Sequence, residues 1–367
     1  SEEDINDAIH RIVPSEYKNT WQQLDNPLYA FKKIAKGPKI KKPKHIFFIV
    51  GESIPQWSLD ETHKLLNICP GLWDFKSQPN TVQIPNFLPA GNVSRPSIVS
   101  LMSGIYDAGL ELNEREQFWN GSFPTSFAYQ MKQLGYQTIY WYGGNASYGN
   151  FNHFGKAQGF DRVESASIFC GPDAPKTWVG VYDHIFLENI EQQIKAIDTP
   201  TFHFIYTTSN HSPYKIEDSL LDYDPATVMP HVGEDLRSNK TRNKELATYR
   251  YSDKALFSFV DSMKKAYPDS LFIITGDHSN LFGDLNNTSL IHRDYTLRDT
   301  FCTVALLQHP DLDSNMITTQ KGTHMSLMPT IIEAIAPKGF EYYSITPSLF
   351  DDQPETLVTP YQWITDS

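Results

Sequence analysis

Polar side chains that could bind a metal ion or an anion follow directly after four apolar runs of the sequence. The four turns are Gly51-Glu52-Ser53, Gly143-Gly144-Asn145, Ser209-Asn210-His211 and Gly276-Asp277-His278. In open α/β sheets, ligands bind beyond the carboxyl ends of the strands, so residues in such turns are the first candidates for a site.

Asp277 and His278 are candidate metal ligands that are adjacent in sequence. Neighbouring side chains of a strand point to opposite faces, so the two can share an ion only where the strand has ended, and Gly276 supplies that break. A carboxylate and an imidazole together suit Zn²⁺ or Mn²⁺ better than Mg²⁺ or Ca²⁺. Glu52 is a third ligand if its strand lies beside theirs. The alternative is that these residues are a turn cap, a surface histidine and an ordinary turn carboxylate.

Ser94 lies at the predicted start of a helix, since Pro96 favours the first helical positions and Gly104 favours the stop. We expect Ser94 at the N-cap or just before it, where a serine commonly caps the helix. The same position places the hydroxyl where backbone N–H groups and the helix dipole favour an anion such as a phosphate. The local sequence leaves both roles open.

Two histidines in predicted turns are candidates for binding phosphate oxygens or for protonating a leaving group. They are His211, in the sequence SNHSPY, and His324, in the sequence GTH. Imidazole suits these tasks because its pKa lies near neutral pH. Among twelve histidines, two in turns are equally compatible with structural roles.

Short apolar runs with β-branched and aromatic residues predict the strands that position these candidates. The runs are residues 45–50, 138–142, 201–206, 271–275 and 302–307. Helical patterns separate them over residues 123–134, 184–197 and 245–267. Strands that alternate with helices predict an α/β, doubly wound fold with a mostly parallel sheet and helices on both faces.

The chain divides into three predicted regions. Residues 1–44 form a polar arm with weak helical periodicity, residues 45–336 form the catalytic domain, and residues 337–367 form a small C-terminal appendage of short strands. Within the domain, residues 213–242 are rich in Asp, Pro and Ser and poorly periodic, and a loop of this length is commonly functional. We expect it to cover the substrate.

The composition restricts the class of partner. The net charge of -12 repels a polyanion, which argues against nucleic acid, and the lysines at 39–44 are read as a solvated linker. Three scattered cysteines predict neither a disulfide framework nor a zinc motif. No apolar run approaches the ~18 residues of a membrane helix, and the N-terminus lacks the features of a signal peptide. The sequence is still compatible with an ectodomain cut from a membrane-tethered protein.

Taken together, these fragments resemble the alkaline phosphatase and sulfatase superfamily, in particular its lipoteichoic acid synthase and phosphoglycerol or phosphoethanolamine transferase branch. The segment 94–104, SRPSIVSLMSG, is similar to the sulfatase signature and places Ser94 on the nucleophile. The resemblance implies one divalent metal ion, Mn or Zn, with a set of four ligands: Glu52, Ser94, Asp277 and His278. It also implies that His211 and His324 face the substrate and act in catalysis.

Two departures from the family pattern narrow the chemistry. Ile98 stands where sulfatases need the arginine for conversion of the nucleophile to formylglycine, so we expect Ser94 to remain a hydroxyl suited to phosphorus chemistry. The threonine nucleophile and the Trp-Asn-Arg patch of lipoteichoic acid synthases are also missing. The corresponding region supplies four candidates for binding the substrate together with His211: Asn145, Tyr148, Asn150 and Asn152.

The resemblance implies a transferase that moves a phosphoglycerol-type head group from a phospholipid to a glycan or glycerol hydroxyl through a covalent Ser94 intermediate. Such domains are tethered outside the cytoplasmic membrane, so we expect a periplasmic or outer-face location and a membrane anchor N-terminal to this sequence. Two alternatives stay open. One is a phosphodiesterase, phosphatase or sulfatase-like hydrolase with water as acceptor, and the other is an inactive binding scaffold.

Overall fold

The computed structural model describes residues 26–224, 226, 238–280 and 296–365. The predicted helical periodicity of the N-terminal arm and the central part of the predicted loop 213–242 lie outside these residues. Within them, no helix combines the length and apolarity required to cross a membrane.

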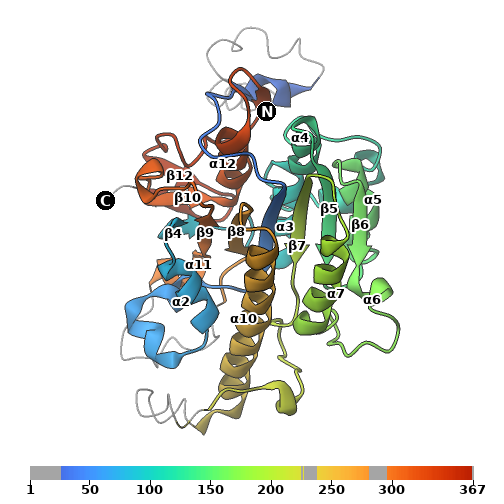
Figure 1. The fold of residues 1–367 in the computed structure, drawn as a ribbon, viewed down its shortest axis with the longest axis vertical. Coiled ribbons are helices and arrows are strands. Elements are labelled where there is room, and N and C mark those ends of the chain that lie inside the picture. Colours follow the sequence, from blue (N-terminus) through green and yellow to red (C-terminus); the bar gives the residue numbers. More distant parts are fainter. Residues whose placement is uncertain (1–25, 225, 227–237, 281–295, 366–367) are drawn as a thin grey trace, which may run out of the picture.

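A mixed sheet of seven strands forms the centre of the molecule (Figure 1). Its order is β3 (Thr81–Gln83), β9 (Ala305–Gln308), β8 (Leu271–Gly276), β2 (His45–Gly51), β7 (Thr201–Tyr206), β5 (Gln137–Tyr142) and β6 (Arg162–Ser165). The strands from β8 to β6 are parallel, and β9 runs antiparallel to both of its neighbours. The predicted α/β fold with a mostly parallel sheet is confirmed.

The alternation of side chains along β2 explains why helices cover both faces of the sheet. Phe47 and Ile49 belong to one core cluster, whereas Ile46, Phe48 and Val50 belong to the other, as the two-residue period of a strand requires. Each of these side chains is fully buried, and burial of a large apolar side chain contributes roughly 1.5–3 kcal/mol.

The helices divide between these two clusters. The cluster of Phe47 includes residues of α2 (Pro70–Ser77), α7 (Asp183–Lys195) and α10 (Lys240–Ala266). The cluster of Phe48 includes residues of α3 (Ser94–Ser103), α4 (Phe127–Gln133), α5 (Phe151–Ala157) and α12 (His324–Ile335). Two short helices, α6 (Ala166–Phe169) and α11 (Leu297–Phe301), complete the set among the described residues. The expected cover on both faces is present (Figure 1).

Three small strand pairs surround the central sheet. Strand β1 (Lys32–Ile34) pairs antiparallel with β11 (Glu341–Tyr343), β4 (Asn86–Leu88) pairs parallel with β10 (Lys321–Thr323), and β12 (Thr356–Val358) pairs antiparallel with β13 (Trp363–Thr365). Tyr342 and Leu349 of the C-terminal region are buried in the core cluster of Phe48. The predicted boundaries at residues 44 and 336 remain predictions, but strands from outside both boundaries pair with each other.

The register of the sheet determines where the polar turns meet. Gly51 at the end of β2 pairs with Gly276 at the end of β8, and Val50 pairs with Tyr206 at the end of β7. Because the three strands are parallel and end at the same level, the residues that follow them lie side by side. The turns after β2, β7 and β8 thus form one edge of the sheet.

Candidate functional site

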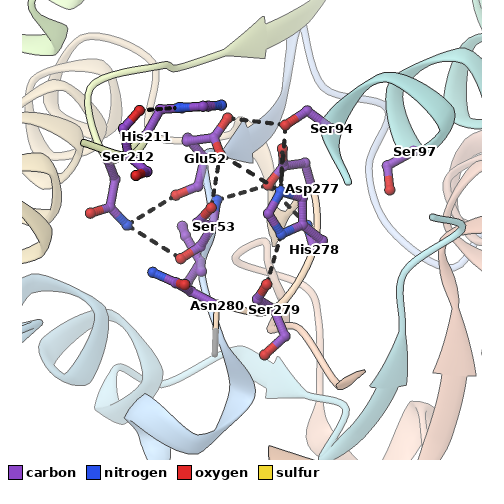
Figure 2. A network of polar contacts seen from close by, with 12 residues as sticks. Glu52, Ser53, Ser94, Ser97, His211, Ser212, Asp277, His278, Ser279 and Asn280 are labelled. Atoms are coloured by element: carbon purple, nitrogen blue, oxygen red, sulfur yellow. Dashed lines mark hydrogen bonds and ion pairs between the residues drawn. The ribbon is translucent and has the colours of Figure 1, made fainter. Parts of the chain in front are cut away.

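The residues that follow β2 and β8 form one acidic cluster with a histidine. One ligand atom from each of Glu52, Asp277 and His278 lies within 4.8 Å of the other two (Figure 2). The Nε2 atom of His278 lies 3.7 Å from Glu52 Oε1 and 3.5 Å from Asp277 Oδ2. Strand β8 ends at Gly276, so Asp277 and His278 can both turn towards the same point. The predicted ligands are therefore brought together.

The donor set fits a divalent cation of the zinc or manganese type. Two carboxylates and one imidazole nitrogen are ligands that these ions accept readily. The Nδ1 of His278 lies 2.7 Å from the carbonyl oxygen of Ser279, and because a carbonyl only accepts, Nδ1 carries the proton. This bond leaves the lone pair of Nε2 directed at the two carboxylates, which is the usual orientation of a metal-bound histidine.

Burial makes two adjacent carboxylates costly without a cation. Glu52 is 2% exposed and Asp277 is 0% exposed. Burial, and after it the charge of Asp277, raise the pKa of Glu52. Burial opposes protonation of His278, but the charges of Asp277 and Glu52 outweigh it and raise the pKa of this imidazole. A bound cation would offset the negative charge of the two carboxylates, which contributes to both shifts.

Backbone and hydroxyl donors orient the two carboxylates. The N–H of Ser53 donates to Asp277 Oδ1 over 2.7 Å, and its hydroxyl donates to Glu52 Oε1 over 2.8 Å. The hydroxyl of Tyr206 lies 2.8 Å from Glu52 Oε2 and 3.0 Å from Asp277 Oδ2. Since a hydroxyl carries one proton, Tyr206 can donate to only one of the two carboxylates at a time.

Ser94 faces this cluster and does not cap its helix. The N-cap of α3 is Val93, and no side chain caps that end. The Oγ of Ser94 lies 3.4 Å from Glu52 Oε2 and 3.4 Å from His278 Nε2, at the long end for hydrogen bonds. Figure 2 shows the hydroxyl directed at the carboxylates from the start of α3. The N-terminus of α3 therefore presents uncapped backbone donors next to the cluster.

A pocket of about 640 Å³ opens beside Ser94. The residues that line it include six aromatic ones: Tyr142, Tyr148, Phe151, Trp178, Tyr206 and Tyr361. Of the predicted substrate-binding residues, Asn145, Tyr148 and His211 line it, whereas Asn150 and Asn152 do not. The Asn150 amide instead donates to Glu114, and the Asn152 N–H donates to the carbonyl of Ala146. These two asparagines hold the turn that presents Tyr148 and Asn145.

His211 lies at the wall of this pocket with a fixed ring. Its Nδ1 lies 2.6 Å from the carbonyl oxygen of Ser212 and therefore donates to it, which leaves Nε2 as the atom that can exchange a proton. The indole N–H of Trp178 donates to the same carbonyl over 3.0 Å, and the two rings meet edge to face at 5.1 Å. His211 thus lines the same pocket as Ser94, and its predicted role towards a substrate remains a prediction.

His324 differs from the expectation of a residue that faces the substrate. It is 1% exposed and does not line the pocket. Its Nδ1 accepts from the N–H of Ala90 over 3.0 Å, and its Nε2 donates to the carbonyl of Gly276 over 2.9 Å. Burial lowers the pKa of His324 to about 4, so the ring is neutral at physiological pH. With both nitrogens engaged, His324 supports the turn that carries Asp277 and does not reach a substrate.

Sequence reasoning missed Tyr206, and it placed Asn210 in a candidate turn without giving this residue a role. Tyr206 is the last residue of a predicted strand beside that of Glu52, so the rule about strand ends could have found it. Asn210, which is 3% exposed, donates to the carbonyl oxygens of Glu52 and Ser53 over 3.2 and 3.3 Å. Its place after an apolar run marked the turn as a candidate, but nothing in the sequence indicated that this side chain supports the backbone of Glu52 and Ser53.

Comparison with known proteins identifies the fold and the family of this chain. The sulfatase family model matches residues 44–336. A lipoteichoic acid synthase-like protein of Bacillus subtilis, YvgJ, is 26% identical over 152 residues, which are 40% of this chain and 23% of that protein. The match thus spans about a quarter of that relative.

Two solved structures share the fold over nearly the whole chain. A protein of the alkaline phosphatase superfamily from Vibrio parahaemolyticus superposes with a TM-score of 0.72 and 21% identity, covering 98% of this chain and 84% of its own. The lipoteichoic acid synthase LtaP from Listeria monocytogenes superposes with a TM-score of 0.70 and 15% identity, with the same coverage. Because the family match covers most of the chain and includes every residue of the cluster around Ser94, this chain belongs to the sulfatase family.

Proposed function

We propose that this domain transfers a phosphoglycerol-type head group from a phospholipid to a hydroxyl acceptor through a phosphorylated Ser94. The observation that carries the proposal is the position of the Ser94 hydroxyl, between the ligand cluster and the aromatic pocket. Ile98 in place of the sulfatase arginine favours phosphorus over sulfur chemistry. The names of the Bacillus and Listeria relatives point in the same direction.

Glu52, Asp277 and His278 would hold the divalent cation, with Ser94 as a fourth ligand. Such a cation supplies Lewis-acid polarisation and lowers the pKa of a bound hydroxyl. The uncapped N-terminus of α3 provides further donors for the charge on the transferring phosphoryl group. The strand ends hold Glu52, Asp277 and His278, and α3 holds Ser94, before substrate arrives, so little reorganisation accompanies the reaction.

The proposed reaction has two balanced displacements. In the first, Ser94 Oγ forms a bond to phosphorus and loses its proton to solvent, while the bond to the lipid alcohol breaks. His211, in its protonated form, gives the Nε2 proton to the departing oxygen. In the second, neutral His211 takes a proton from the incoming hydroxyl, whose oxygen bonds to phosphorus as the bond to Ser94 breaks. The departing Ser94 oxygen takes a proton from solvent, which replaces the one lost in the first step and restores the serine.

We also propose that the domain works outside the cytoplasmic membrane and is tethered there by a segment that precedes it. A phospholipid donor lies in a bilayer, and a tether raises its effective concentration at the pocket. Exposed aromatic side chains at the pocket, Tyr148 at 66% and Trp178 at 69%, suit the boundary between lipid and water.

The test is incubation of the purified domain with phosphatidylglycerol vesicles and Zn²⁺ or Mn²⁺, with and without a glycan acceptor. The expected result is release of diacylglycerol, a glycerol phosphate adduct on Ser94 detected by mass spectrometry, and faster turnover with the acceptor. Release that is independent of the acceptor would favour a hydrolase. No release and no adduct with either metal would overturn the proposal.

A further inference from the structure

Glu245, on α10, is a buried carboxylate that contacts two loops of the site. Glu245 is only 2% exposed, which is unusual for a residue with an ionisable side chain. Its Oε1 accepts from the Tyr214 hydroxyl over 2.7 Å and from the Asn280 amide over 3.2 Å. The Asn280 amide also lies 3.2 Å from the Tyr214 hydroxyl, so the three side chains form one closed set. Arg242 pairs with the second oxygen, Oε2, over 2.5 Å.

The two loops that meet at Glu245 carry the two histidines of the site. Tyr214 lies three residues after His211, and its N–H donates to the His211 carbonyl over 3.0 Å. Asn280 lies two residues after His278, the metal-ligand candidate. Glu245 comes from a different part of the chain and touches neither a metal ligand nor the pocket.

The backbone of Tyr214 requires a strong anchor. Its φ is +58°, in the left-handed region that an aromatic residue rarely adopts. Strained residues of this kind persist where the surrounding structure determines them, and they cluster at functional sites. The hydrogen bond from the Tyr214 hydroxyl to a buried carboxylate is of the stronger, charge-assisted type. It holds the turn 211–214 in the conformation that directs His211 into the pocket.

We propose that Glu245 is a positioning residue that fixes the loop of His211 relative to the loop of His278. The inference rests on the proposed function, since it takes His211 and the ligand cluster to act on one substrate. Tyr214 transmits the effect to the substrate side, and Asn280 transmits it to the metal side. A shift of about 1 Å between such groups costs on the order of a hundredfold in rate.

The kinetic test uses Tyr214→Phe, which removes one hydroxyl and keeps the ring. We expect kcat/KM for a phosphodiester to fall about tenfold, with the zinc affinity unchanged. In the His211→Ala background the same substitution should have no further effect, because Tyr214 acts through His211. A matched control is Tyr342→Phe. It removes a buried hydrogen bond of 2.8 Å from the Tyr342 hydroxyl to Glu333, and both residues are far from Tyr214 in the sequence. This control should lower the melting temperature and leave kcat/KM unchanged. An equal loss in both backgrounds would overturn the role of Tyr214.

The second test does not depend on activity. Hydrogen exchange of the metal-free protein is followed for Glu245→Ala, Tyr214→Phe and Tyr342→Phe. Glu245→Ala should speed exchange by about tenfold or more in both loops, residues 211–214 and 277–280. Tyr214→Phe should speed exchange only in residues 211–214. The control Tyr342→Phe should leave exchange in both loops unchanged. Unchanged exchange in both loops of Glu245→Ala would overturn the proposal. If that variant does not fold, Asn280→Ala replaces it, with faster exchange expected in 277–280 alone. A wild-type domain inactive on every phosphodiester would refute the proposed function, whereas the exchange pattern still decides the inference.

Discussion

Ser94 allows a clear separation of a chemical role from a structural one. An N-cap serine replaced by alanine costs about 1 kcal/mol of stability, but Ser94 caps nothing in this structure. We expect Ser94→Ala to lower turnover by about 10³-fold or more while the free energy of unfolding changes by less than about 0.5 kcal/mol. Turnover measured beside urea denaturation checks both.

Ser97, one turn further along α3, provides the matched control. Its hydroxyl donates to the Gly91 carbonyl over 3.1 Å, and Figure 2 shows it apart from the carboxylates. Ser97→Ala should lower the free energy of unfolding by about 1 kcal/mol and leave the zinc affinity unchanged. If Ser94→Ala instead lowers the stability and leaves turnover unchanged, the role of Ser94 is structural, as a helix cap, and not chemical.

We expect Glu52 to make the binding of a metal ion depend on pH. The pKa of Glu52 is raised in the metal-free fold, so the folded protein holds a proton that the unfolded chain releases. The stability of the metal-free fold therefore falls as the pH rises from the ordinary glutamate pKa of about 4.3 towards the raised value. A cation displaces that proton, so its binding strengthens with pH. We expect the zinc-induced rise in melting temperature to be larger at about pH 7.5 than at about pH 5.5.

Glu52→Gln tests the origin of this dependence. The amide carries no charge, so the metal-free variant should melt at a higher temperature than the wild type at about pH 7.5, and it should lose most of the zinc effect. Melting curves with and without a chelator provide the measurement. An equal response of wild type and variant to zinc would show that Glu52 is not a ligand.

At the scale of elements, His324 joins the start of α12 to the end of β8 and to the segment before α3. The unfolded chain binds a proton on this histidine near pH 6.5, whereas burial lowers the pKa in the fold to about 4. The sign is therefore opposite to that of Glu52: stability is complete above the ordinary histidine pKa and is lost as pH falls through it. The loss begins near the ordinary histidine pKa and approaches about 3 kcal/mol only once the pH has fallen through the folded-state value of about 4.

The prediction is a steeper acid destabilisation in wild type than in His324→Gln. Urea unfolding between about pH 7 and about pH 4.5 should show the free-energy gap between the two proteins narrowing as the pH falls. His45 and His203 are also buried with lowered pKa values, but they are present in both proteins and cancel in the comparison. A constant gap would show that His324 is not held neutral.

The sequence predicts a strand or helix well where the residue pattern within that element alone is sufficient. Continuous apolar runs predicted β2, β5, β7 and β8 to within a residue or two, because buried parallel strands contain few polar residues. Strand β9 was misplaced by three residues at its start, and its antiparallel direction depends on its neighbours in the sheet. Helix α10 begins at Lys240, earlier than predicted, because the side chain of Asn239 caps it.

The grouping of the candidate ligands was predictable from the sequence, whereas the residues that support them were less so. Glu52, Asp277 and His278 follow glycines at strand ends, a local signal that remains valid in three dimensions. His324 resembles an active-site histidine in sequence, and only its bonds to Ala90 and Gly276 reveal the supporting role. Glu245 gave no signal because its partners lie 31 and 35 residues away.

At the scale of the whole molecule, the C-terminal region is part of the core. Strand β11 pairs with β1, and Tyr342 and Leu349 are 1% exposed. Removal of residues 337–367 would expose these contacts, and two large apolar side chains alone contribute roughly 3–6 kcal/mol, a large share of the stability of a typical domain.

We therefore expect the truncated protein to aggregate or to melt well below the full chain. Expression of residues 1–336 and of the full chain, compared by solubility and by melting temperature, provides the measurement. Removal of only residues 359–367, which ends the β12–β13 pair and leaves β11 in place, serves as the control and should be milder. A truncated protein that melts like the full chain would instead support an independent appendage.

The pairing of Gly51 with Gly276 also has a consequence for when the enzyme becomes competent. The hydrogen bond from Ser53 to Asp277 spans 224 residues, so it cannot form before most of the chain has been synthesised. Contacts of such long range close late in folding, because loop-closure entropy opposes them until the intervening strands have assembled. A nascent chain that is still emerging, stretched or threaded through a translocation channel would hold no ion at this place. The chain would thus have no metal-dependent activity until it had folded.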